Sequence, residues 1–357
     1  LQLEQDGKLT LTEQVQAKDL FRSIMKTQIE TGLPYLAFKD EINRRNPNKH
    51  KGYIPGVNLC VAPETRVLTD QGQIPIKDLE GTVVKVWNGF EWSQVEVRKT
   101  GENQRLLKVH LSNGEILECT YHHHFWVQVD YKGKLKQVDA KDLKPGDKLI
   151  KYDLPLVSST DDVPFPSVYT SGLDKFTVPL NGYTVKSRLD WLAGLADAEG
   201  TIQRNGDNEQ LVISSVHPNF LREVRLMLQT LGVDSKVTQM FKPMTRLLPD
   251  GKGSKKSYDC KASYRLIITS NGLYSLSQLG FTTNRLKWEV RHPQRDAARF
   301  IQVEKVEFTD RFDDTYCFSE PLRHLGMFNG ILTGQCVESY SNVKPGEEAH
   351  TCNLISL

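Results

Sequence analysis

The dipeptide Cys-Val occurs at residues 60–61 and again at 336–337, and this repeat limits the organisation of the chain more than any other feature. The first copy lies in GVNLCVAPETRVLT and the second in ILTGQCVESYSN. If residues 60–335 were cut out, the flanking segments would join as GVNLCVESYSN without interruption. The sequence therefore supports the hypothesis that the middle of the chain is an insertion that removes itself.

Size and composition are those of a soluble protein with two or three domains. The chain has 357 residues, of which 25% are charged and 38% are hydrophobic, and this length exceeds that of one typical core. The net charge is +2, but residues 151–300 contain 20 Lys and Arg against 15 Asp and Glu. A basic middle fits a polyanionic partner, and it fits a solvated surface equally well.

The cellular compartment is predicted from features that the sequence lacks. No run of about 18 apolar residues occurs, so we expect no membrane span, and we find no signal peptide. The chain opens on Leu1 and stops at NLISL, so we expect both ends to be cuts through a longer protein. The cysteines fit neither a disulfide framework nor a zinc site, which favours reduced thiols in the cytoplasm. They are Cys60, Cys119, Cys260, Cys317, Cys336 and Cys352.

Residues 60–154 show the pattern of a compact all-β unit. Three hairpin signals occur in VVKVWNGFEWSQVEV, LLKVHLSNGEILECT and WVQVDYKGKLKQV. The first two turn at Asn-Gly, the pair that a type I′ turn prefers. The β texture resumes after residue 301 in IQVEKVEF, TYCF and MFNGILT. We therefore predict one β unit formed by residues 60–154 and 296–335.

A segment of different texture interrupts this β unit. Residues 155–185 are rich in Pro, Ser, Thr and Asp, which predicts a linker. Residues 186–295 alternate helical and strand patterns in an αββαββα-like order, which predicts an α/β domain. In the flanks, 1–59 and 336–357, we expect short helical and irregular segments, with a helix in residues 10–31.

Four residue positions suggest a site for acyl transfer. A lone Cys60 is more often a small buried apolar residue. Here the Cys-Val repeat is accompanied by a Thr-x-x-His pattern at Thr120 and His123, and by His324 shortly before Cys336. A Cys, a Thr and His side chains gathered in one pocket can activate a thiol and protonate a leaving group.

Blocks of sequence at both ends of the insertion resemble those of inteins, which are self-splicing insertions. CVAPETRVLT resembles the first block, and GEILECTYHHHFWV resembles the second. TYCFSEPLRHLGMFNGILTGQC resembles the last two. The resemblance implies a mainly β Hint-type splicing domain that acts on its own chain and needs no cofactor.

The resemblance also implies roles at the first junction. The thiolate of Cys60 attacks the carbonyl carbon of Leu59 and converts that peptide bond into a thioester. Thr120 and His123 assist this step, with His123 as the acid or base. Cys317 lies where the family often has Asp or Cys near the active site, and a plain strand cysteine is an equal alternative.

At the second junction, the resemblance implies that Cys336 takes over the acyl group. Gln335 then cyclises through its side-chain amide and cleaves its own link to Cys336, assisted by His324. The family usually ends in His-Asn, whereas this sequence has Gly334-Gln335. A glutamine closes a six-membered ring rather than a five-membered one, so the splicing rate stays open.

Three consecutive histidines leave an assignment open. On a strand, His122 and His124 share one face and His123 faces the other. The Thr-x-x-His spacing selects His123 as the functional residue. Two ligands on one strand are half of a zinc site, and the sequence offers no convincing second pair.

The run LAGLADAEG at residues 192–200 resembles the LAGLIDADG motif of homing endonucleases. The resemblance implies that Glu199 and Asp197 hold Mg²⁺ for hydrolysis of double-stranded DNA at an intein-free host gene. Only one such motif occurs, which implies a homodimer through this helix or a decayed remnant. An ordinary helix that ends at Gly200 is the simpler alternative.

The joined flanks resemble the catalytic subunit of ribonucleotide reductase. Asn58, Cys336 and Glu338 match an Asn-x-Cys-x-Glu active-site loop, in which the Cys is the radical residue. Cys352 in HTCNLISL resembles one of the reducing cysteines. The reductase class and the radical source stay open.

Two other functions fit part of the sequence. A hedgehog-type autoprocessing domain would share Cys60 and the Thr-x-x-His pattern, but it would end the chain without an amide residue followed by Cys336. A DNA endonuclease whose β domain no longer splices would fit the motif at 192–200. The coherent sequence on both sides of the insertion favours splicing.

Overall fold

The computed structural model describes most of the chain, and the chain divides into two compact units. One unit comprises residues 1–57 and 340–357, and the other comprises 58–339. This division falls within four residues of the expected ends of the insertion. The described residues are 16–31, 60–130, 133–159, 168–175, 177–206, 208–249, 251, 254–292 and 300–334.

In the first unit, the described element is helix α2 (Ala17–Thr31). It confirms the C-terminal end of the helix predicted for residues 10–31, whereas residues 10–15 lie outside the described part. Asp19 in its first turn favours the helix N-terminus, because a carboxylate there faces the positive end of the helix dipole.

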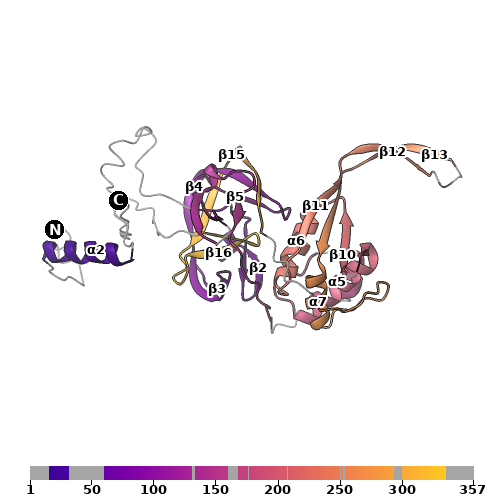
Figure 1. The fold of residues 1–357 in the computed structure, drawn as a ribbon, viewed down its shortest axis with the longest axis horizontal. Coiled ribbons are helices and arrows are strands. Elements are labelled where there is room, and N and C mark those ends of the chain that lie inside the picture. The colour runs from indigo at the N-terminus through magenta and orange to yellow at the C-terminus, as the bar shows by residue number, and fades with distance from the viewer. Residues whose placement is uncertain are drawn as a thin grey trace. The chain divides into compact units, whose positions relative to one another are not determined.

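The larger unit contains an antiparallel sheet built from both ends of the insertion (Figure 1). The strands follow the order β15-β4-β3-β1-β16-β17, with β2 paired to β1 and β5 paired to β4. They are β1 (Arg66–Thr69), β2 (Gly72–Pro75), β3 (Val83–Trp87), β4 (Trp92–Leu111), β5 (Ile116–Thr120), β15 (Val303–Phe318), β16 (Leu325–Phe328) and β17 (Ile331–Gly334). The single β unit predicted from two separated segments is therefore present.

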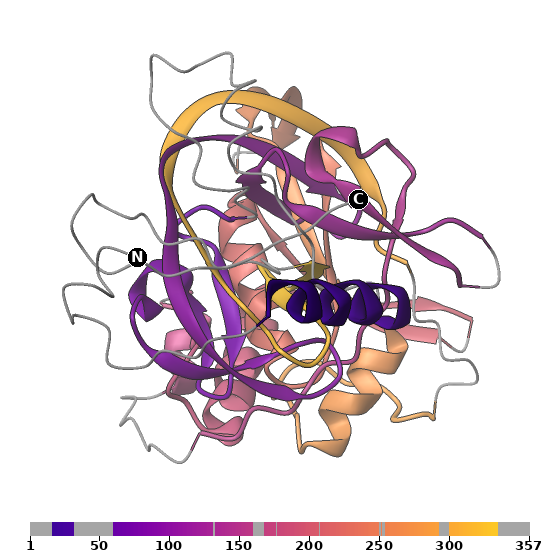
Figure 2. The same cartoon turned by 90° about the vertical axis from the view of Figure 1, so that its left-hand side faces the viewer.

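The long strands β4 and β15 join these two segments. They pair antiparallel from Val303 opposite Leu111 to Phe318 opposite Val97, with several register shifts along the way. Figure 2 shows the two strands curving together along the β unit. Register shifts of this kind bend a strand and increase its twist, which allows a long pair to wrap around a core.

A smaller sheet completes the β unit, in the order β7-β6-β8. Its strands are β6 (His124–Gln128), β7 (Leu135–Asp139) and β8 (Lys148–Leu149). Two short 3₁₀ turns, η2 (Ile76–Leu79) and η3 (Ala140–Asp142), connect strands of the unit. All three predicted hairpins are present, as the pairs β3–β4, β4–β5 and β6–β7.

The predicted turn type is wrong at both Asn-Gly sites of those hairpins. Gly89 and Gly114 have positive φ, but the preceding asparagines do not, so neither turn is type I′. The I′ signature occurs instead between β16 and β17, where Asn329 (φ 47°) and Gly330 (φ 66°) separate the paired Phe328 and Ile331. The turn leads directly into β17, which ends at Gly334.

The α/β segment contains a four-stranded sheet in the order β11-β14-β10-β9. Its elements follow the predicted αββαββα order. They are α5 (Val185–Glu199), β9 (Gly200–Asn205), β10 (Asn208–Ser215), α6 (Pro218–Gln229), β11 (Lys236–Phe241), β14 (Ser263–Ile268) and α7 (Ser270–Gln278). Alternate residues such as Leu211, Ile213 and Leu266 join the helices in one buried core, so the helices cover one face of the sheet.

Two segments of this region differ from the sequence-based expectation. The prediction of a polar loop at 250–258 is wrong in part, because β13 (Lys255–Cys260) occupies its second half. It pairs with β12 (Met244–Pro249) in a hairpin that projects beyond the sheet (Figure 1). Within the expected linker 155–185, residues 168–173 form helix α4 (Val168–Leu173). Val178 and Leu180 are also buried in the core of the α/β segment. The polar composition of residues 155–185 did not predict that they pack on the α/β segment, because a few buried apolar side chains suffice for such packing.

None of the helices among the described residues is long and apolar enough to cross a membrane.

Candidate functional site

The first candidate residue, Cys60, is held at the centre of the β unit. Its side chain is fully buried. The next residue, Val61, exchanges two backbone hydrogen bonds of 3.1 Å with Tyr316 of β15 and also bridges to Cys119 of β5. The apolar Val61 suits this interior position, so the local sequence holds Cys60 next to two strands.

Thr120 holds the backbone of Cys60 in both directions. The amide nitrogen of Cys60 donates to Thr120 Oγ1 at 3.2 Å, and the amide nitrogen of Thr120 donates to the Cys60 carbonyl oxygen at 2.9 Å. The Cys60 amide nitrogen is the atom that would leave when the preceding peptide bond breaks. A hydroxyl at this atom orients the bond and lies where a proton must arrive.

Thr100 of β4 is a third residue at Cys60, and sequence reasoning missed it. Its Oγ1 lies 2.7 Å from Cys60 Sγ and 3.1 Å from the carbonyl oxygen of Thr315. The hydroxyl therefore links the sulfur of Cys60 to the backbone of β15. No sequence signal marked Thr100, because it lies 40 residues away in the middle of a long strand.

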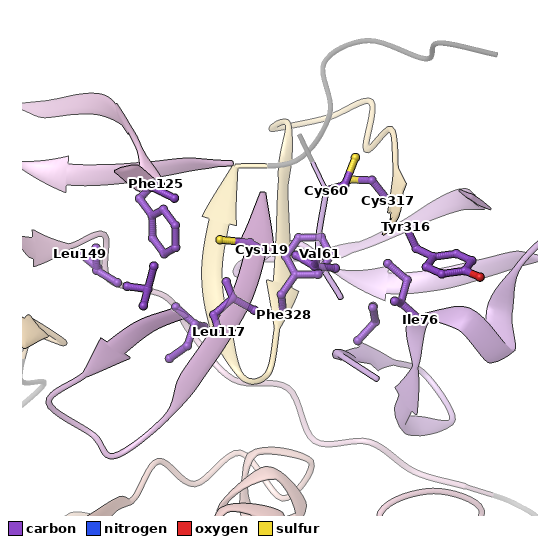
Figure 3. Packing of buried hydrophobic residues seen from close by; sticks show 14 of the residues in the cluster. Cys60, Val61, Ile76, Leu117, Cys119, Phe125, Leu149, Tyr316, Cys317 and Phe328 are labelled. Atoms are coloured by element: carbon purple, nitrogen blue, oxygen red, sulfur yellow. The ribbon is translucent and has the colours of Figure 1, made fainter. Parts of the chain in front are cut away.

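Cys317 lies beside Cys60. Because Val61 and Tyr316 form a hydrogen-bonded antiparallel pair, the neighbouring residues Cys60 and Cys317 form a non-hydrogen-bonded pair, in which side chains approach closely. Figure 3 shows the two side chains together in the packed cluster. Cys317 is fully buried, and its Sγ donates to the carbonyl oxygen of Phe318 at 3.5 Å.

His123 is the buried member of the three consecutive histidines. Its ring contacts Phe125 and Phe328 edge-on, and its Nε2 lies 2.8 Å from Thr333 Oγ1. Burial, together with the neighbouring His124, lowers the pKa of His123 to about 3. The imidazole is therefore neutral at physiological pH.

The hydrogen bonds of Thr333 fix the tautomer of His123. The Thr333 hydroxyl donates to the Gly334 carbonyl oxygen at 3.2 Å, so it accepts the hydrogen of His123 Nε2. The lone pair is then on Nδ1, which has no hydrogen-bond partner in the described parts of the chain. A buried acceptor without a partner is uncommon in a folded protein, which marks Nδ1 as a candidate functional atom. Thr333, like Thr100, was missed by sequence reasoning.

The other two histidines form a surface cluster. His122 Nδ1 lies 2.9 Å from Asp139 Oδ2, and His124 Nε2 lies 3.3 Å from Asp139 Oδ1. Within the described residues, no group of three His, Cys, Asp or Glu side chains could hold a metal ion. His123 is buried between an exposed and a half-buried histidine, as the expected alternation predicts, but the expected strand is present only from His124, where β6 begins.

The second candidate junction, between Gln335 and Cys336, follows the β16–β17 hairpin directly in the sequence. His324 immediately precedes β16, and Leu325 of β16 pairs with Gly334 of β17. The buried Glu320 accepts backbone hydrogen bonds from Leu322 and Arg323, which orders the loop before His324. Several predicted residues lie outside the described part of the chain: Asn58, Gln335, Cys336, Glu338 and Cys352.

The acidic residues of helix α5 already have protein partners. Asp197 accepts hydrogen bonds from Tyr169 Oη at 2.6 Å and from the amides of Asn284 and Arg285 at 2.8 Å each. Glu199 is paired with Lys175. A Mg²⁺ ion needs carboxylate oxygens that are free to coordinate it. In this arrangement the two acids do not fit a metal site.

Helix α4 packs tightly against α5, the helix with the LAGLADAEG run. Two glycines make this possible, because a Cβ on Gly194 would lie 2.0 Å from the Tyr169 carbonyl oxygen, and one on Gly172 would lie 2.0 Å from that of Trp191. Small residues at such contacts let two helix backbones approach closely. The small-residue face of α5 therefore packs against a segment of its own chain.

Comparisons with known proteins found similar solved structures and similar sequences. Structures of an intein from a hyperthermophile and of a DnaB intein from Synechocystis sp. PCC 6803 each align with 77% of this chain, and with 99% and 97% of their own chains. The TM-scores are 0.30 and 0.27, at 10% and 9% identity.

Three sequence relatives are ribonucleoside-diphosphate reductases. The large subunit from Invertebrate iridescent virus 6 is 44% identical over 412 residues, covering 96% of this chain and 42% of the viral protein. A subunit alpha from Bacillus subtilis is 22% identical, covering 90% of this chain and 40% of the relative. Subunit alpha of Synechocystis is 54% identical over 66 residues, covering 18% of this chain and 9% of the relative.

The chain thus spans about two fifths of the length of the first two relatives. A match over 96% of the chain necessarily includes most of residues 60–335, so the viral relative has a counterpart of the middle segment. The family model "Ribonucleotide reductase, barrel domain" matches residues 1–357. The chain belongs to the ribonucleotide reductase large-subunit family.

Proposed function

We propose that residues 60–335 are an intein that excises itself and joins residues 1–59 to residues 336–357. The observation that supports this most directly is the geometry at Cys60. Its amide nitrogen is bound by the Thr120 hydroxyl, and its sulfur lies against the Thr100 hydroxyl. One residue therefore presents both a nucleophile and an oriented leaving atom, as an acyl shift requires.

The first step moves the acyl group from nitrogen to sulfur. The thiolate of Cys60 attacks the carbonyl carbon of Leu59, the carbon–nitrogen bond breaks, and the amide nitrogen becomes an amine by taking one proton. The proton that the Cys60 thiol loses is the one that the nitrogen gains, so the step balances. Thr120 Oγ1 lies 3.2 Å from this nitrogen, and the amide of His123 donates to the Thr120 carbonyl oxygen at 3.1 Å, which places His123 beside the same residue for the transfer. Buried surroundings exclude water, which would otherwise hydrolyse the thioester.

The later steps take place at the second junction. The Cys336 thiolate attacks the thioester and accepts the first flank, while Cys60 regains its thiol. The side-chain nitrogen of Gln335 then attacks its own carbonyl carbon, which releases the amine of Cys336. A shift from sulfur to nitrogen forms the Leu59–Cys336 peptide bond.

The test is incubation of the purified chain followed by mass spectrometry. Splicing yields a 276-residue excised product and an 81-residue ligated product, which are the lengths given by junctions at 60 and 336. Hydrolysed fragments without a ligated product would contradict the proposal. They would instead favour a splicing-impaired unit or a hedgehog-type domain.

The ligated product is proposed to be part of a reductase catalytic subunit. Joining the flanks restores the run NLCVESYSN, with Asn58, Cys336 and Glu338 in one short loop. In the unspliced chain Cys336 is separated from Asn58 by the whole insertion, so the precursor cannot use this loop. Reductase activity should therefore appear in the full-length host only after splicing, and activity of an unspliceable full-length precursor would contradict this.

A second function, DNA binding by the α/β segment, is favoured by the β12–β13 hairpin. This projecting arm contains Arg246, Lys255 and Lys256 against a single described acid, Asp259, which is held by Thr245. A two-stranded ribbon fits the major groove of duplex DNA. The face of the sheet opposite the helices is also polar, with Gln203, Gln210, Ser214, Thr238 and Arg265.

DNA cleavage is a separate question from DNA binding, because Asp197 and Glu199 do not fit a metal site as they stand. Binding of duplex DNA by the full chain should weaken with salt, and replacing the three basic arm residues by Gln should reduce the salt slope by about 1 for each lost phosphate contact. An unchanged slope would exclude the arm as the DNA contact.

A further inference from the structure

Helix α6 of the α/β segment contains a buried arginine that binds the β unit. The Arg225 side chain is fully buried. Its Nη1 lies 3.3 Å from Glu115 Oε2, and its Nη2 donates to the carbonyl oxygen of Gly330 at 3.1 Å. Burial raises the pKa of Glu115, and the positive charge of Arg225 opposes that rise. A buried charge of this kind is tolerated only while its partners stay in place.

A second residue of the same helix binds the same carbonyl group. Gln229 Nε2 donates to the Gly330 carbonyl oxygen at 2.9 Å, and the Tyr152 hydroxyl donates to it at 3.0 Å. Arg225 also reaches the Asn329 carbonyl oxygen at 3.4 Å. Helix α6 therefore holds both residues of the type I′ turn between β16 and β17.

The fit at this turn is close. A Cβ on Gly330 would lie 2.0 Å from Gln229 Oε1, and the positive φ of Gly330 also disfavours any side chain. On its other side, Asn329 is held by the β unit, since its side chain accepts from the Arg66 amide at 2.8 Å and donates to the Ile116 carbonyl oxygen at 3.2 Å. The turn is thus clamped between the two parts of the unit.

The turn positions strand β17, which leads to the second junction. Strand β17 begins at Ile331, directly after Gly330, and ends at Gly334, directly before Gln335. One residue of this strand, Thr333, is the hydrogen-bond partner of His123. A shift of the turn would therefore move the last residues before the cleaved bond relative to the catalytic groups.

We propose that Arg225 and Gln229 are positioning residues for the second splice junction. The α/β segment is then required for efficient splicing and cannot be removed without slowing it. This inference rests on the proposed splicing function. It modifies the simple division of the insertion into two independent domains. Glu199 of helix α5 and the β12–β13 arm lie outside this requirement.

The same helix offers a matched control. Arg222, one turn before Arg225, also crosses to the β unit, where its Nε donates to the Gly114 carbonyl oxygen at 2.7 Å. It binds the β4–β5 turn and makes no contact with Asn329 or Gly330 among the described interactions. Substituting it breaks a contact across the same boundary but leaves the clamp on the β16–β17 turn.

The two junctions can be assayed separately in the full chain. In a Cys336→Ala background, thiol-induced cleavage before Cys60 reports formation of the thioester. In a Cys60→Ala background, release of residues 336–357 reports cleavage at the second junction. Arg225→Met should slow the second reaction about tenfold or more, because it removes buried hydrogen bonds to the turn, and should change the first by less than about threefold.

Gln229→Met should slow the second reaction by about threefold to tenfold, and Arg222→Met should leave it near the wild-type rate. If Arg225→Met fails to fold, Gln229→Met decides the question. Wild-type release rates in both variants would overturn the inference, as would equal slowing of both junctions by all three substitutions. A wild type that forms no ligated product would instead refute the proposed splicing itself.

Discussion

The β unit and the α/β segment each bury a titratable side chain, but the two side chains differ in how many hydrogen-bond partners they have. In the β unit, His123 keeps Nδ1 without a hydrogen-bond partner among the described residues, and burial holds its imidazole neutral. In the α/β segment, Asp197 accepts three hydrogen bonds from Tyr169, Asn284 and Arg285.

This difference distinguishes a group ready for reaction from a structural one. A lone pair that no hydrogen-bond donor occupies stays accessible to a reacting group, whereas a fully bonded carboxylate stabilises the fold and resists exchange of partners. Both groups belong to motifs that suggest catalysis from sequence. The surrounding hydrogen bonds favour catalysis in the β unit and a structural role at Asp197.

The largest effect should come from the nucleophile of the β unit. Cys60→Ala removes the attacking sulfur, so thioester formation and ligation should be lost completely, while binding of duplex DNA stays unchanged. Mass spectrometry of incubated protein measures the first, and gel shift measures the second. Cys260→Ala, which changes a half-exposed cysteine of the α/β segment, serves as the control and should splice normally. A ligated product from Cys60→Ala would break the contrast.

The next effect concerns stability and pH. The folded protein keeps His123 neutral with a pKa of about 3, whereas an ordinary histidine has a pKa of 6.5. Below pH 6.5 the unfolded chain takes up a proton that the folded chain refuses, so stability is lost as the pH falls from 6.5 toward 3. Between pH 7 and 5 this group should lower the free energy of unfolding by about 2 kcal/mol.

Urea titrations of splicing-blocked Cys60→Ala protein at both pH values measure this difference. The same titrations with His123→Gln added should show a pH dependence that is smaller by that amount, since glutamine does not titrate. Identical pH dependence in the two proteins would show that His123 is not held neutral by burial.

A smaller effect should follow loss of the Thr100 hydroxyl. Thr100→Val keeps the shape of the side chain but removes the group 2.7 Å from Cys60 Sγ, so thiol-induced cleavage before Cys60 should slow about tenfold. Thr100→Ser keeps the hydroxyl and should retain most of the rate. If the valine variant matches wild type, Thr100 only packs against the sulfur.

The smallest effect is expected at Glu199. Glu199→Gln removes the charge that pairs with Lys175, at a surface position far in sequence from the splicing residues. Splicing should proceed within about twofold of the wild-type rate, because an exposed ion pair contributes little to stability. Strong inhibition of splicing would show that the coupling between the segments extends beyond helix α6.

Much of the fold could be predicted because the signals are local. The three hairpins of the β unit follow from alternating β-prone runs around glycines, and the order of helices and strands in residues 186–295 follows from hydrophobic periodicity. Turn type was harder, since Asn88 and Asn113 avoid positive φ while Asn329 adopts it. The β12–β13 hairpin was missed because its exposed strands lack an apolar alternation.

The sequence by itself predicts where the proposed splicing begins and ends, through Cys60, Cys336 and the run that continues across them. Tertiary structure alone decided which polar groups surround that chemistry. Thr100 and Thr333 meet Cys60 and His123 across 40 and 210 residues of chain, and Arg225 meets Gly330 across 105. Hydrogen bonds between such distant residues depend on how strands and helices pack, and local sequence patterns do not specify that packing.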